Sequence, residues 1–260
     1  MTGAITDQPA ELRSELFTGD CLDIMPALPA GSIDAIITDL PYGTTNCVGD
    51  TVIPFEPLWA EVRRLLKPQG IFVTTAAQPF TSYLVTSNPR WFRYAMVWIK
   101  NRATGFLDAN RRPLNNIEDI LVFAPGRHTY NPQMTTGVRH KRGGKRRPSP
   151  NTHYRDFNEP GPTWSDQHYP TRTLEIPVVR LHTAHPTQKP QALAEYLIRT
   201  YTNRGDLVLD PCMGSGTTGL AALATGRRFI GIEKGHGYAA LAAARIAQAV
   251  TPAQPPLLAL

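Results

Sequence analysis

The sequence predicts an α/β fold with a mostly parallel sheet. Two apolar runs, Ser32–Thr38 and Leu207–Leu209, have the near-continuous hydrophobicity of strands that are covered on both faces. The second run continues into Asp210–Thr218, a glycine-rich turn, and then into Gly219–Thr225, whose Ala and Leu content favours a helix. A strand, a glycine turn and a helix in this order form a ligand-binding corner at the carboxyl edge of a parallel sheet.

The other elements alternate as a single sheet requires. Further strands are expected at Glu15–Thr18, Ile71–Thr75, Phe92–Lys100, Asp119–Ala124 and Arg228–Ile232. Apolar residues at helical spacing predict helices at Pro57–Lys67, Gln78–Thr86, Pro190–Tyr201 and Tyr238–Val250. The polar segment 101–116 separates two strands that are expected to pair as the antiparallel end of the sheet.

The position of the glycine corner near the end of the chain limits the topology. Because few residues follow Thr218, the strands beside Leu207–Leu209 must come from the N-terminal half. Asp39 and Asp210 would then lie at the ends of neighbouring strands. The strand at Glu15–Thr18 is expected on the outer side of the sheet.

Composition sets the outer limits. The chain has 260 residues, of which 42% are hydrophobic, enough for one sizeable core and a modest insertion. Lys and Arg number 27 against 21 Asp and Glu, and the net charge of +6 favours an anionic partner such as nucleic acid. The three cysteines, Cys21, Cys47 and Cys212, form no CxxC pair, so neither a metal site nor a disulfide framework is indicated.

Three features indicate a cytoplasmic protein. Widely spaced cysteines without a pairing pattern suit a reducing compartment. No apolar run approaches the roughly 18 residues that a membrane span needs. The N-terminus lacks the charged and then apolar pattern of a signal peptide. A membrane partner is therefore not expected.

The charge of the glycine corner limits the ligand that it can bind. Gly214 and Gly216 allow positive φ and close approach of a ligand, and Thr217 or Thr218 can cap the following helix. The turn formally matches GxGxxG, which leaves a dinucleotide as one alternative and a purely structural turn as another. However, the Asp210 carboxylate repels a pyrophosphate and attracts an ammonium or sulfonium group. S-adenosylmethionine carries both cations and no phosphate, so it is the expected cofactor.

A second polar group, Asp39-Leu40-Pro41-Tyr42, follows the strand Ser32–Thr38. The exocyclic amine of a nucleobase is a poor nucleophile, so a catalyst gains by accepting both of its hydrogens. The Asp39 carboxylate can accept one hydrogen and a backbone carbonyl of Leu40 or Pro41 the other. Tyr42 would stack on the base. An ordinary strand-end turn accounts for the same residues about equally well.

Three motifs together resemble the β group of amino DNA methyltransferases. Asp39-Leu40-Pro41-Tyr42 is similar to the Asp-Pro-Pro-Tyr catalytic motif, with Leu40 in place of the first Pro. The turn Asp210–Thr218 is similar to the cofactor motif, and His185–Pro190 (His-Pro-Thr-Gln-Lys-Pro) resembles the segment that precedes it. The catalytic motif, a basic insertion and the cofactor motif follow in the circularly permuted order of this group.

This resemblance implies a Rossmann-like S-adenosylmethionine-dependent methyltransferase sheet, mostly parallel with one antiparallel strand. Residues 15–125 would be the catalytic half, 126–184 a target-recognition insertion, 185–250 the cofactor-binding half and 251–260 a tail. The expected catalytic residues are Asp39, Leu40, Pro41 and Tyr42. The expected cofactor-binding residues are Asp20, Cys21, Asp39, Lys189, Asp210, Pro211, Gly214, Ser215, Gly216, Thr217, Thr218 and Glu233. In this set, the Glu233 carboxylate can accept hydrogen bonds from ribose hydroxyls.

A basic run lies within the insertion. Its cations, which must be solvated or face phosphate, are Lys141, Arg142, Lys145, Arg146 and Arg147. A disordered surface loop is the plain alternative. Because the run lies between the catalytic and cofactor halves, the resemblance implies that it binds double-stranded DNA. A homodimer also fits the resemblance, whereas a partner restriction endonuclease is not indicated by any residue.

The expected function is site-specific methylation of adenine N6 in DNA. An Asp at the first position of the catalytic motif, here Asp39, resembles the adenine-modifying members, whereas cytosine-modifying members more often carry Ser. Cytosine-N4 methylation and an inactive DNA-binding protein of the same fold remain alternatives. A cytosine-carbon methyltransferase would need a thiolate such as Cys212, but that cysteine lies within the cofactor corner.

Overall fold

The computed structural model describes residues 14–44, 50–142, 163–179 and 188–250. The chain divides into two compact units. Pro132–Thr171 forms the smaller unit, and the residues on either side of this segment form the larger one. The larger unit contains the main sheet and the helices, so it also contains both predicted motifs.

The larger unit is built on an eight-stranded sheet in the order β1-β10-β9-β2-β3-β5-β4-β8. Its strands are β1 (Ser14–Thr18), β2 (Ile33–Thr38), β3 (Leu66–Ala76), β4 (Phe92–Thr104), β5 (Asn115–Phe123), β8 (Thr173–Glu175), β9 (Leu207–Asp210) and β10 (Arg228–Glu233). Neighbouring strands are parallel except at β5, which is antiparallel to both β3 and β4. The predicted sheet, mostly parallel with one antiparallel strand, is confirmed.

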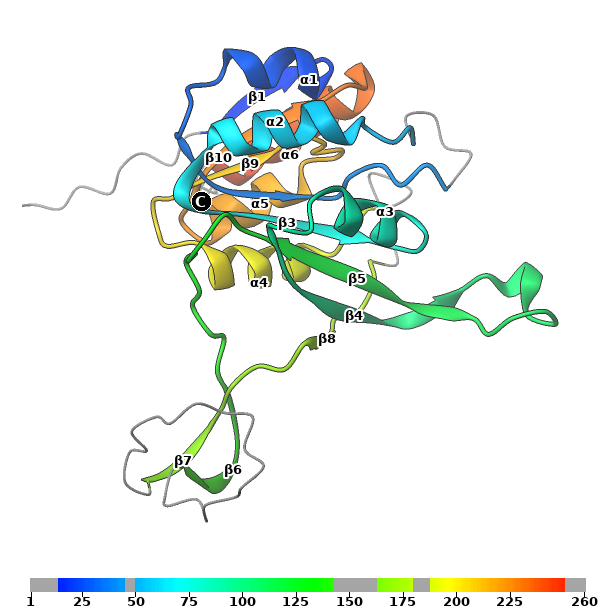
Figure 1. Ribbon diagram of the computed structural model, residues 1–260, viewed down its shortest axis with the longest axis vertical. Coiled ribbons are helices and arrows are strands. Elements are labelled where there is room, and N and C mark those ends of the chain that lie inside the picture. The colour runs from blue at the N-terminus through cyan, green and yellow to red at the C-terminus, as the bar shows by residue number, and fades with distance from the viewer. Residues whose placement is uncertain (1–13, 45–49, 143–162, 180–187, 251–260) are drawn as a thin grey trace, which may run out of the picture. The chain divides into compact units, whose positions relative to one another are not determined.

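Helices cover both faces of this sheet (Figure 1). One layer comprises α1 (Cys21–Ile24), the 3-10 turn η1 (Met25–Ala27), α2 (Phe55–Leu65) and α3 (Phe80–Ser87). The other layer comprises α4 (Gln191–Tyr201), α5 (Thr217–Ala224) and α6 (His236–Val250). Successive side chains of β2 pack alternately against the two helix layers. Ile36 packs in the core with α2, whereas Ile37 packs in the core with α4. This double burial explains why the strand at Ile33–Thr38 is apolar along nearly its whole length.

The predicted strand neighbours are also confirmed. β2 pairs in parallel with β9, with Ile36 opposite Leu209. Asp39 and Asp210 therefore stand at the carboxyl ends of adjacent strands. β1 lies at the outer edge of the sheet beside β10, as expected.

The break between α2 and β3 differs from the prediction. We expected the helix to reach Lys67 and Pro68–Gly70 to separate it from the strand, but α2 ends at Leu65 and β3 begins at Leu66. The start of β3 lies where its pairing with β2 shifts register, between the Ile33 and Ala35 positions of β2. A proline, which has no N–H for the ladder, is tolerated at such an irregularity.

Three strands were missed, and a hairpin is longer than expected. No strand was predicted within 126–184, yet the segment contributes β6 (Thr135–Arg142), β7 (Thr163–His168) and β8. β8 joins the main sheet beside β4. The loop between these two strands is shorter than the predicted segment 101–116, because β4 continues to Thr104 and β5 begins at Asn115. The short turn η2 (Phe106–Asp108) lies between them.

The smaller unit contains the antiparallel pair of β6 and β7, in which Lys141 stands opposite Trp164. The Arg139 guanidinium lies 5.8 Å from the centroid of the Trp164 ring. Trp164 and Tyr169 are 61% and 65% exposed in this structure. None of the helices in the described part of the chain is both long and apolar enough to cross a membrane.

Candidate active site

Asp39 stands at the carboxyl end of β2, where neighbouring elements fix its carboxylate. Oδ1 accepts a hydrogen bond of 2.8 Å from the Tyr42 hydroxyl and another from the Thr75 hydroxyl. Oδ2 lies 2.8 Å from Lys189 Nζ. Thr75 reaches this position because β3 is the next strand of the sheet. The Asp39 side chain is 31% exposed, so the carboxylate is held in place and remains accessible.

Lys189 connects the Asp39 carboxylate to a second carboxylate. Its Nζ lies 3.3 Å from Glu118 Oε2 on β5, and Glu118 Oε1 accepts a 3.0 Å bond from Lys100 on β4. Burial lowers the pKa of Lys189, but Asp39 and Glu118 together raise the pKa above its ordinary value. Lys189 is therefore a cation at neutral pH. The structure places the Lys189 ammonium group on Asp39, and the cofactor contact that we expected for Lys189 stays a prediction.

Tyr42 packs its ring beside the same carboxylate. The ring stacks on Phe80, with centroids 5.2 Å apart and an interplanar angle of 26°. Lys189 Nζ lies 5.6 Å from the Tyr42 ring centroid. Burial, reinforced by Asp39 and Glu118, raises the pKa of the Tyr42 hydroxyl well above its usual range, so the hydroxyl stays protonated and donates to Asp39.

The two middle residues of the catalytic motif differ in burial. The Leu40 side chain is only 3% exposed and packs in the core with α2, while Pro41 is half-buried. The Leu40 side chain therefore contributes to folding, and only the backbone of this residue is available to a ligand.

Asp210 ends β9 and is almost completely buried. Its Oδ1 accepts bonds of 2.7 Å from the Thr38 hydroxyl and 3.0 Å from the Cys212 backbone N–H. Burial raises the pKa of Asp210 to about 6, against the lowering effect of the Thr218 and Thr38 hydroxyls. The carboxylate is thus mostly ionised at neutral pH, but without a cation bound to it in the described part of the chain.

The glycine turn leads directly into α5. Gly214 and Gly216 have φ of 52° and 79°, the left-handed region that favours glycine. Gly216 occupies the N-cap position and no side chain caps the helix, so the predicted capping by Thr217 or Thr218 is wrong. The Thr217 hydroxyl is buried and has no hydrogen-bond partner in the described part of the chain. A Cβ on Gly219 would lie 2.6 Å from the Phe229 ring, so this glycine serves packing rather than ligand binding.

The remaining residues of the corner are mostly engaged with the protein itself. Pro211 is buried, and Ser215 Oγ accepts a 2.9 Å bond from Arg245 Nη1 on α6. Glu233, at the end of β10, accepts bonds from the backbone N–H groups of Gly214 at 2.9 Å and Gly235 at 2.7 Å. The Glu233 carboxylate therefore holds the glycine turn in place from the neighbouring strand.

Asp20 and Cys21 lie beyond β1, next to the end of β10. Asp20 caps α1 by accepting a 2.9 Å bond from Leu22 N, and its other oxygen lies 3.0 Å from Lys234 Nζ. The backbone N–H before it, that of Gly19, donates to the Glu233 carbonyl at 2.9 Å. These bonds bring Asp20 and Glu233 to the same edge of the sheet.

Cys212 does not have the character of a nucleophile. A hydrogen bond with Cys21 and burial raise the pKa of the Cys212 thiol well above its ordinary value. A neutral thiol is a weak nucleophile compared with a thiolate. The structure therefore disfavours the cytosine-carbon mechanism.

Some predicted residues fall elsewhere. Lys141 and Arg142 belong to β6 in the smaller unit. The other cations of the basic run, Lys145, Arg146 and Arg147, lie outside the described residues. Two further predicted segments also extend outside the described residues: the loop after the catalytic motif, Asn46–Asp50, is described only at Asp50, and His185–Pro190 only from Gln188.

Four polar residues of the site were missed by the sequence analysis. Thr38 holds Asp210, Thr75 holds Asp39, and Glu118 and Lys100 extend the ion pairs of Lys189. Thr38 and Thr75 look like ordinary β-branched strand residues. Glu118 and Lys100 carried a usable signal, because a charged residue inside an apolar strand requires a partner.

Asp39, which begins the predicted catalytic motif, and Asp210, which begins the glycine turn, thus stand at the carboxyl ends of adjacent strands. A family model for DNA methylases of the N6/N4 type matches residues 33–244. The chain belongs to the N6/N4 DNA methylase family. It is an amino DNA methyltransferase, and the family resemblance predicted from the three motifs is confirmed.

Two characterised relatives are similar over most of this methyltransferase. The chain is 33% identical to the DNA adenine methyltransferase YhdJ of Escherichia coli (strain K12), over 89% of this chain and 83% of that protein. It is 30% identical to the type II methyltransferase M.HpaI of Haemophilus parainfluenzae, over 90% of this chain and 74% of that protein.

Solved structures are similar over comparable lengths. The M1.HpyAVI-SAM complex has a TM-score of 0.59 and 28% identity, covering 89% of this methyltransferase and 99% of that chain. The PvuII DNA methyltransferase, which is cytosine-N4-specific, has a TM-score of 0.66 at 18% identity, over 92% of this chain and 91% of that chain. At that identity the second likeness shows the fold alone.

Proposed function

We propose that this methyltransferase transfers a methyl group from S-adenosylmethionine to N6 of an adenine that is flipped out of double-stranded DNA. The observation that carries the proposal is the arrangement of Asp39 and Asp210 at the carboxyl ends of adjacent strands. One carboxylate adjoins an aromatic ring and a strand-end proline, and the other adjoins the glycine turn. The amine that accepts the methyl group and the cationic cofactor that donates it would therefore meet at this edge.

The glycine corner suits the cofactor. S-adenosylmethionine is the ligand in the solved M1.HpyAVI complex. In the present chain, the buried Thr217 hydroxyl has no partner in the described residues and is available to a ligand. The ionised Asp210 carboxylate attracts the cationic groups of S-adenosylmethionine and disfavours a dinucleotide pyrophosphate. When bound, this cofactor supplies an electrophilic methyl group.

Asp39 would orient the target amine. Its carboxylate accepts one amine hydrogen and the Pro41 carbonyl accepts the other, so that the nitrogen lone pair turns out of the ring plane toward the methyl group. Both oxygens of Asp39 already have protein donors, namely Tyr42, Thr75 and Lys189. The amine must therefore share an oxygen with these groups or displace one of them. We expect the ion pair with Lys189 to lengthen when the base enters.

Adenine is favoured over cytosine by two observations. The catalytic motif begins with Asp39, as in the adenine-modifying members that the motif resembles. In addition, YhdJ, named as a DNA adenine methyltransferase, is 33% identical to this chain. Tyr42 would stack on the flipped base, which repays part of the energy needed to unstack it.

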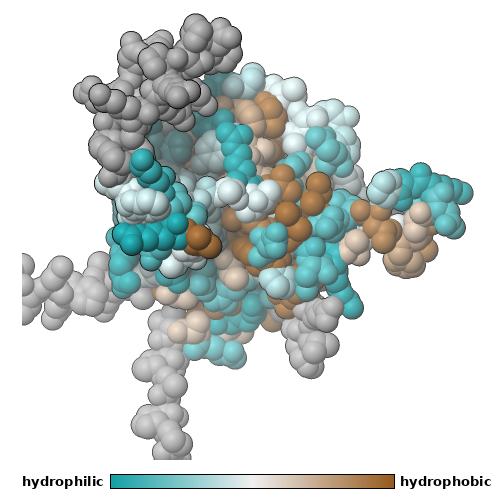
Figure 2. All heavy atoms as spheres, turned by 90° about the horizontal axis from the view of Figure 1, so that it is seen from below, coloured by the Kyte–Doolittle hydropathy of each residue, from teal (hydrophilic) through white to brown (hydrophobic). Residues whose placement is uncertain are grey.

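The hairpin of β4 and β5 is the DNA contact that we infer on the larger unit. β4 runs parallel to β2, so the end of the hairpin lies beyond the same edge as Asp39. Its tip exposes Phe106 by 77% and Leu107 by 86%. Figure 2 shows an arm projecting to the right with apolar and polar residues at its end. Apolar side chains next to the cations Arg111 and Arg112 suit a nucleic acid with an opened base pair.

We further infer that residues 126–184 form the target-recognition segment and that the basic run Lys141–Arg147 contacts DNA phosphate. The smaller unit, Pro132–Thr171, lies within this segment and carries the exposed ring of Trp164. Residues 15–125 and 185–250 would be the catalytic and cofactor-binding halves. We infer a homodimer from the resemblance alone, and a reducing cytoplasm from the widely spaced cysteines.

The test is to incubate the purified protein with unmethylated double-stranded DNA and S-adenosylmethionine that carries a labelled methyl group. Nucleosides from the digested DNA are then separated and identified by mass spectrometry. We expect the label in N6-methyladenine. Label in N4-methylcytosine would overturn the choice of base while retaining the reaction class. No label despite cofactor binding would indicate an inactive DNA-binding protein.

A further inference from the structure

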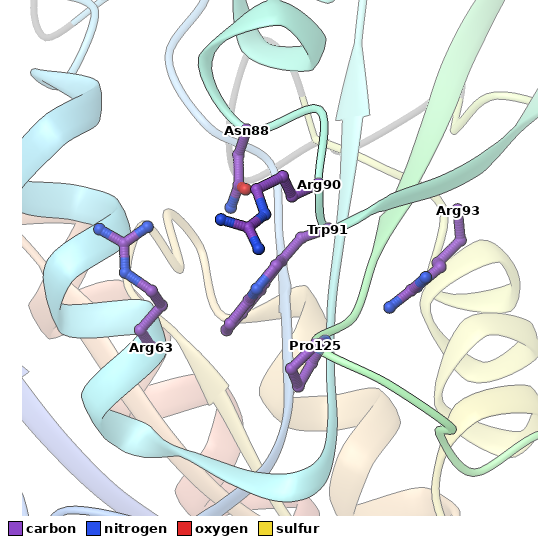
Figure 3. A pocket seen from close by; sticks show the side chains of 6 residues that line it. All are labelled: Arg63, Asn88, Arg90, Trp91, Arg93 and Pro125. Atoms are coloured by element: carbon purple, nitrogen blue, oxygen red, sulfur yellow. The ribbon is translucent and has the colours of Figure 1, made fainter.

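A basic pocket of about 420 Å³ opens at the edge of the sheet opposite Asp39. Arg93 lies at the start of β4, and Pro125 follows the antiparallel strand β5, so both stand at the amino ends of the parallel strands. Arg63 lies in the last turn of α2, just before β3. The lining residues are Arg63, Asn88, Arg90, Trp91, Arg93 and Pro125 (Figure 3).

The charge of this pocket is uncompensated. Three arginines line it and no acidic residue does. Arg93 donates to the Ala124 carbonyl. Neither Arg63 nor Arg90 forms a side-chain hydrogen bond or ion pair with another described residue. Like charges gathered in this way repel one another, and a bound anion removes the repulsion.

A buried donor also lacks an acceptor. Asn88 is only 7% exposed, yet its Nδ2 has no hydrogen-bond partner in the described part of the chain. Figure 3 shows the Asn88 and Arg90 side chains extending from one turn above Trp91, with Arg63 facing them from α2. Buried polar groups are nearly always hydrogen-bonded, so this amide points to a missing acceptor.

We propose that this pocket binds a nucleoside polyphosphate, with its phosphates on Arg63, Arg90 and Arg93 and its base against the half-buried Trp91. Guanidinium groups bind phosphate through two parallel hydrogen bonds, and an indole ring stacks on a nucleobase. The volume suits a small organic molecule, whereas an inorganic phosphate would fill only a fraction of it. The proposal does not depend on the methyl transfer proposed above.

The pocket lies at the opposite edge of the sheet from the DNA site that we propose above. β2 has six residues, so about 20 Å of strand separates the two edges of the sheet. DNA bound at the carboxyl edge beside Asp39 therefore lies away from Arg63 and Arg90. In addition, the pocket is concave and contains the buried Asn88 amide. Such a site fits a small ligand that enters it, rather than a DNA backbone that runs along the protein surface.

The test is calorimetric titration of the full-length protein with ATP in the presence of saturating S-adenosylmethionine, which keeps ATP out of the cofactor site. We expect saturable binding. The double variant Arg63→Ala/Arg90→Ala should weaken it by about tenfold or more, because two charge-assisted contacts are lost. Arg199→Ala is the matched control, since Arg199 is an exposed arginine on α4, away from the pocket. It should leave ATP binding unchanged.

Four results would overturn the proposal. The first is that ATP gives no saturable heat, and the second is that ATP binding is lost when S-adenosylmethionine is added. The third is that the control variant weakens ATP binding as much as the double variant does. The fourth is that tripolyphosphate or adenosine binds as tightly as ATP. Tripolyphosphate at full affinity would mean that only the anion is recognised, and adenosine at full affinity that the arginines do not contribute. Both substituted arginines are exposed, so thermal unfolding should be unchanged and will confirm that the variant is folded.

Discussion

Lys189 Nζ lies 2.8 Å from Asp39 Oδ2, and this ion pair joins two segments that are 150 residues apart in the chain. Asp39 follows β2 in the N-terminal half of the chain, whereas Lys189 lies two residues before the start of α4. The same ammonium group lies 5.6 Å from the centroid of the Tyr42 ring. The pair therefore links the position of the Asp39 carboxylate to the segment that leads into α4.

The Lys189–Asp39 pair should appear as a coupling energy in stability. We expect Lys189→Met to lower the free energy of unfolding by about 3 kcal/mol, because it leaves two partly buried carboxylates without their shared cation. The loss in the double variant Lys189→Met/Asp39→Asn should be smaller than the sum of the single losses by about 1–3 kcal/mol. Urea denaturation of the four proteins gives this coupling. Lys189→Arg retains the charge and is the matched control, and strictly additive losses would contradict a direct pair.

Tyr42 should contribute more through its ring than through its hydroxyl. Tyr42→Phe removes one hydrogen bond to Asp39, so we expect the rate of DNA methylation to fall only about two- to tenfold. Tyr42→Ala also removes the stacking surface, worth about 1–3 kcal/mol, and should cost roughly ten- to a hundredfold more. Steady-state rates on duplex DNA distinguish the two effects. Equal losses in both variants would mean that the ring does not hold the base.

Asp210 should make stability depend on pH. Burial raises its pKa to about 6, so the folded protein holds this proton more tightly than the unfolded chain does. The cost of burying the charge is absent below the unfolded pKa and is fully present above the folded pKa. Asp210→Asn removes that cost, so the variant should gain up to about 3 kcal/mol over wild type as pH rises from about 4 to 7.

Two measurements complete this comparison. Denaturation at pH 4 and at pH 7 gives the stability difference between wild type and Asp210→Asn, and the same difference at both values would contradict the burial cost. At neutral pH the variant should also bind S-adenosylmethionine more weakly, since the carboxylate that attracts the cofactor is gone. A more stable protein with a weaker cofactor site is the expected combination.

The tip of the β4–β5 hairpin should matter for DNA and not for stability. Phe106 and Leu107 are 77% and 86% exposed, so Phe106→Ser/Leu107→Ser should change the free energy of unfolding by less than about 0.5 kcal/mol. Affinity for duplex DNA should fall about tenfold, as expected for loss of an apolar contact with unstacked bases. Fluorescence anisotropy with a labelled duplex measures this. Tyr83→Ser, at a residue 61% exposed on α3, is the control that should leave DNA binding unchanged.

Elements could be predicted from the sequence where their own residues were sufficient to identify them. The apolar run of β2, the glycine turn after β9 and the polar residues at both strand ends could each be recognised locally, and their adjacency followed from the shortage of chain after Thr218. The three-residue strand β8 could not be found in this way. Its strand conformation depends on pairing with β4, a partner about 75 residues earlier in the chain.

The partners of the site residues depended on long-range contacts in the same way. Thr75 acquires its role only because β3 lies beside β2, and Glu118 meets Lys100 only because β5 lies beside β4. Nothing in the local sequence around Lys189 indicates that its ammonium group would lie on Asp39 rather than at the glycine turn. The basic pocket is a further case, since its arginines come from α2 and from both sides of Trp91, and their convergence is visible only in the fold.

The most direct test of the catalytic assignment is a comparison of wild type with Asp39→Asn under single-turnover conditions, using duplex DNA and methyl-labelled S-adenosylmethionine. The substitution keeps the shape of the side chain, and Lys189 retains Glu118 as a partner. We expect label transfer to the adenine amino group to slow by at least about 100-fold in this variant. Cofactor affinity should stay within a few-fold of wild type. A variant that methylates adenine at the wild-type rate would contradict the role of Asp39.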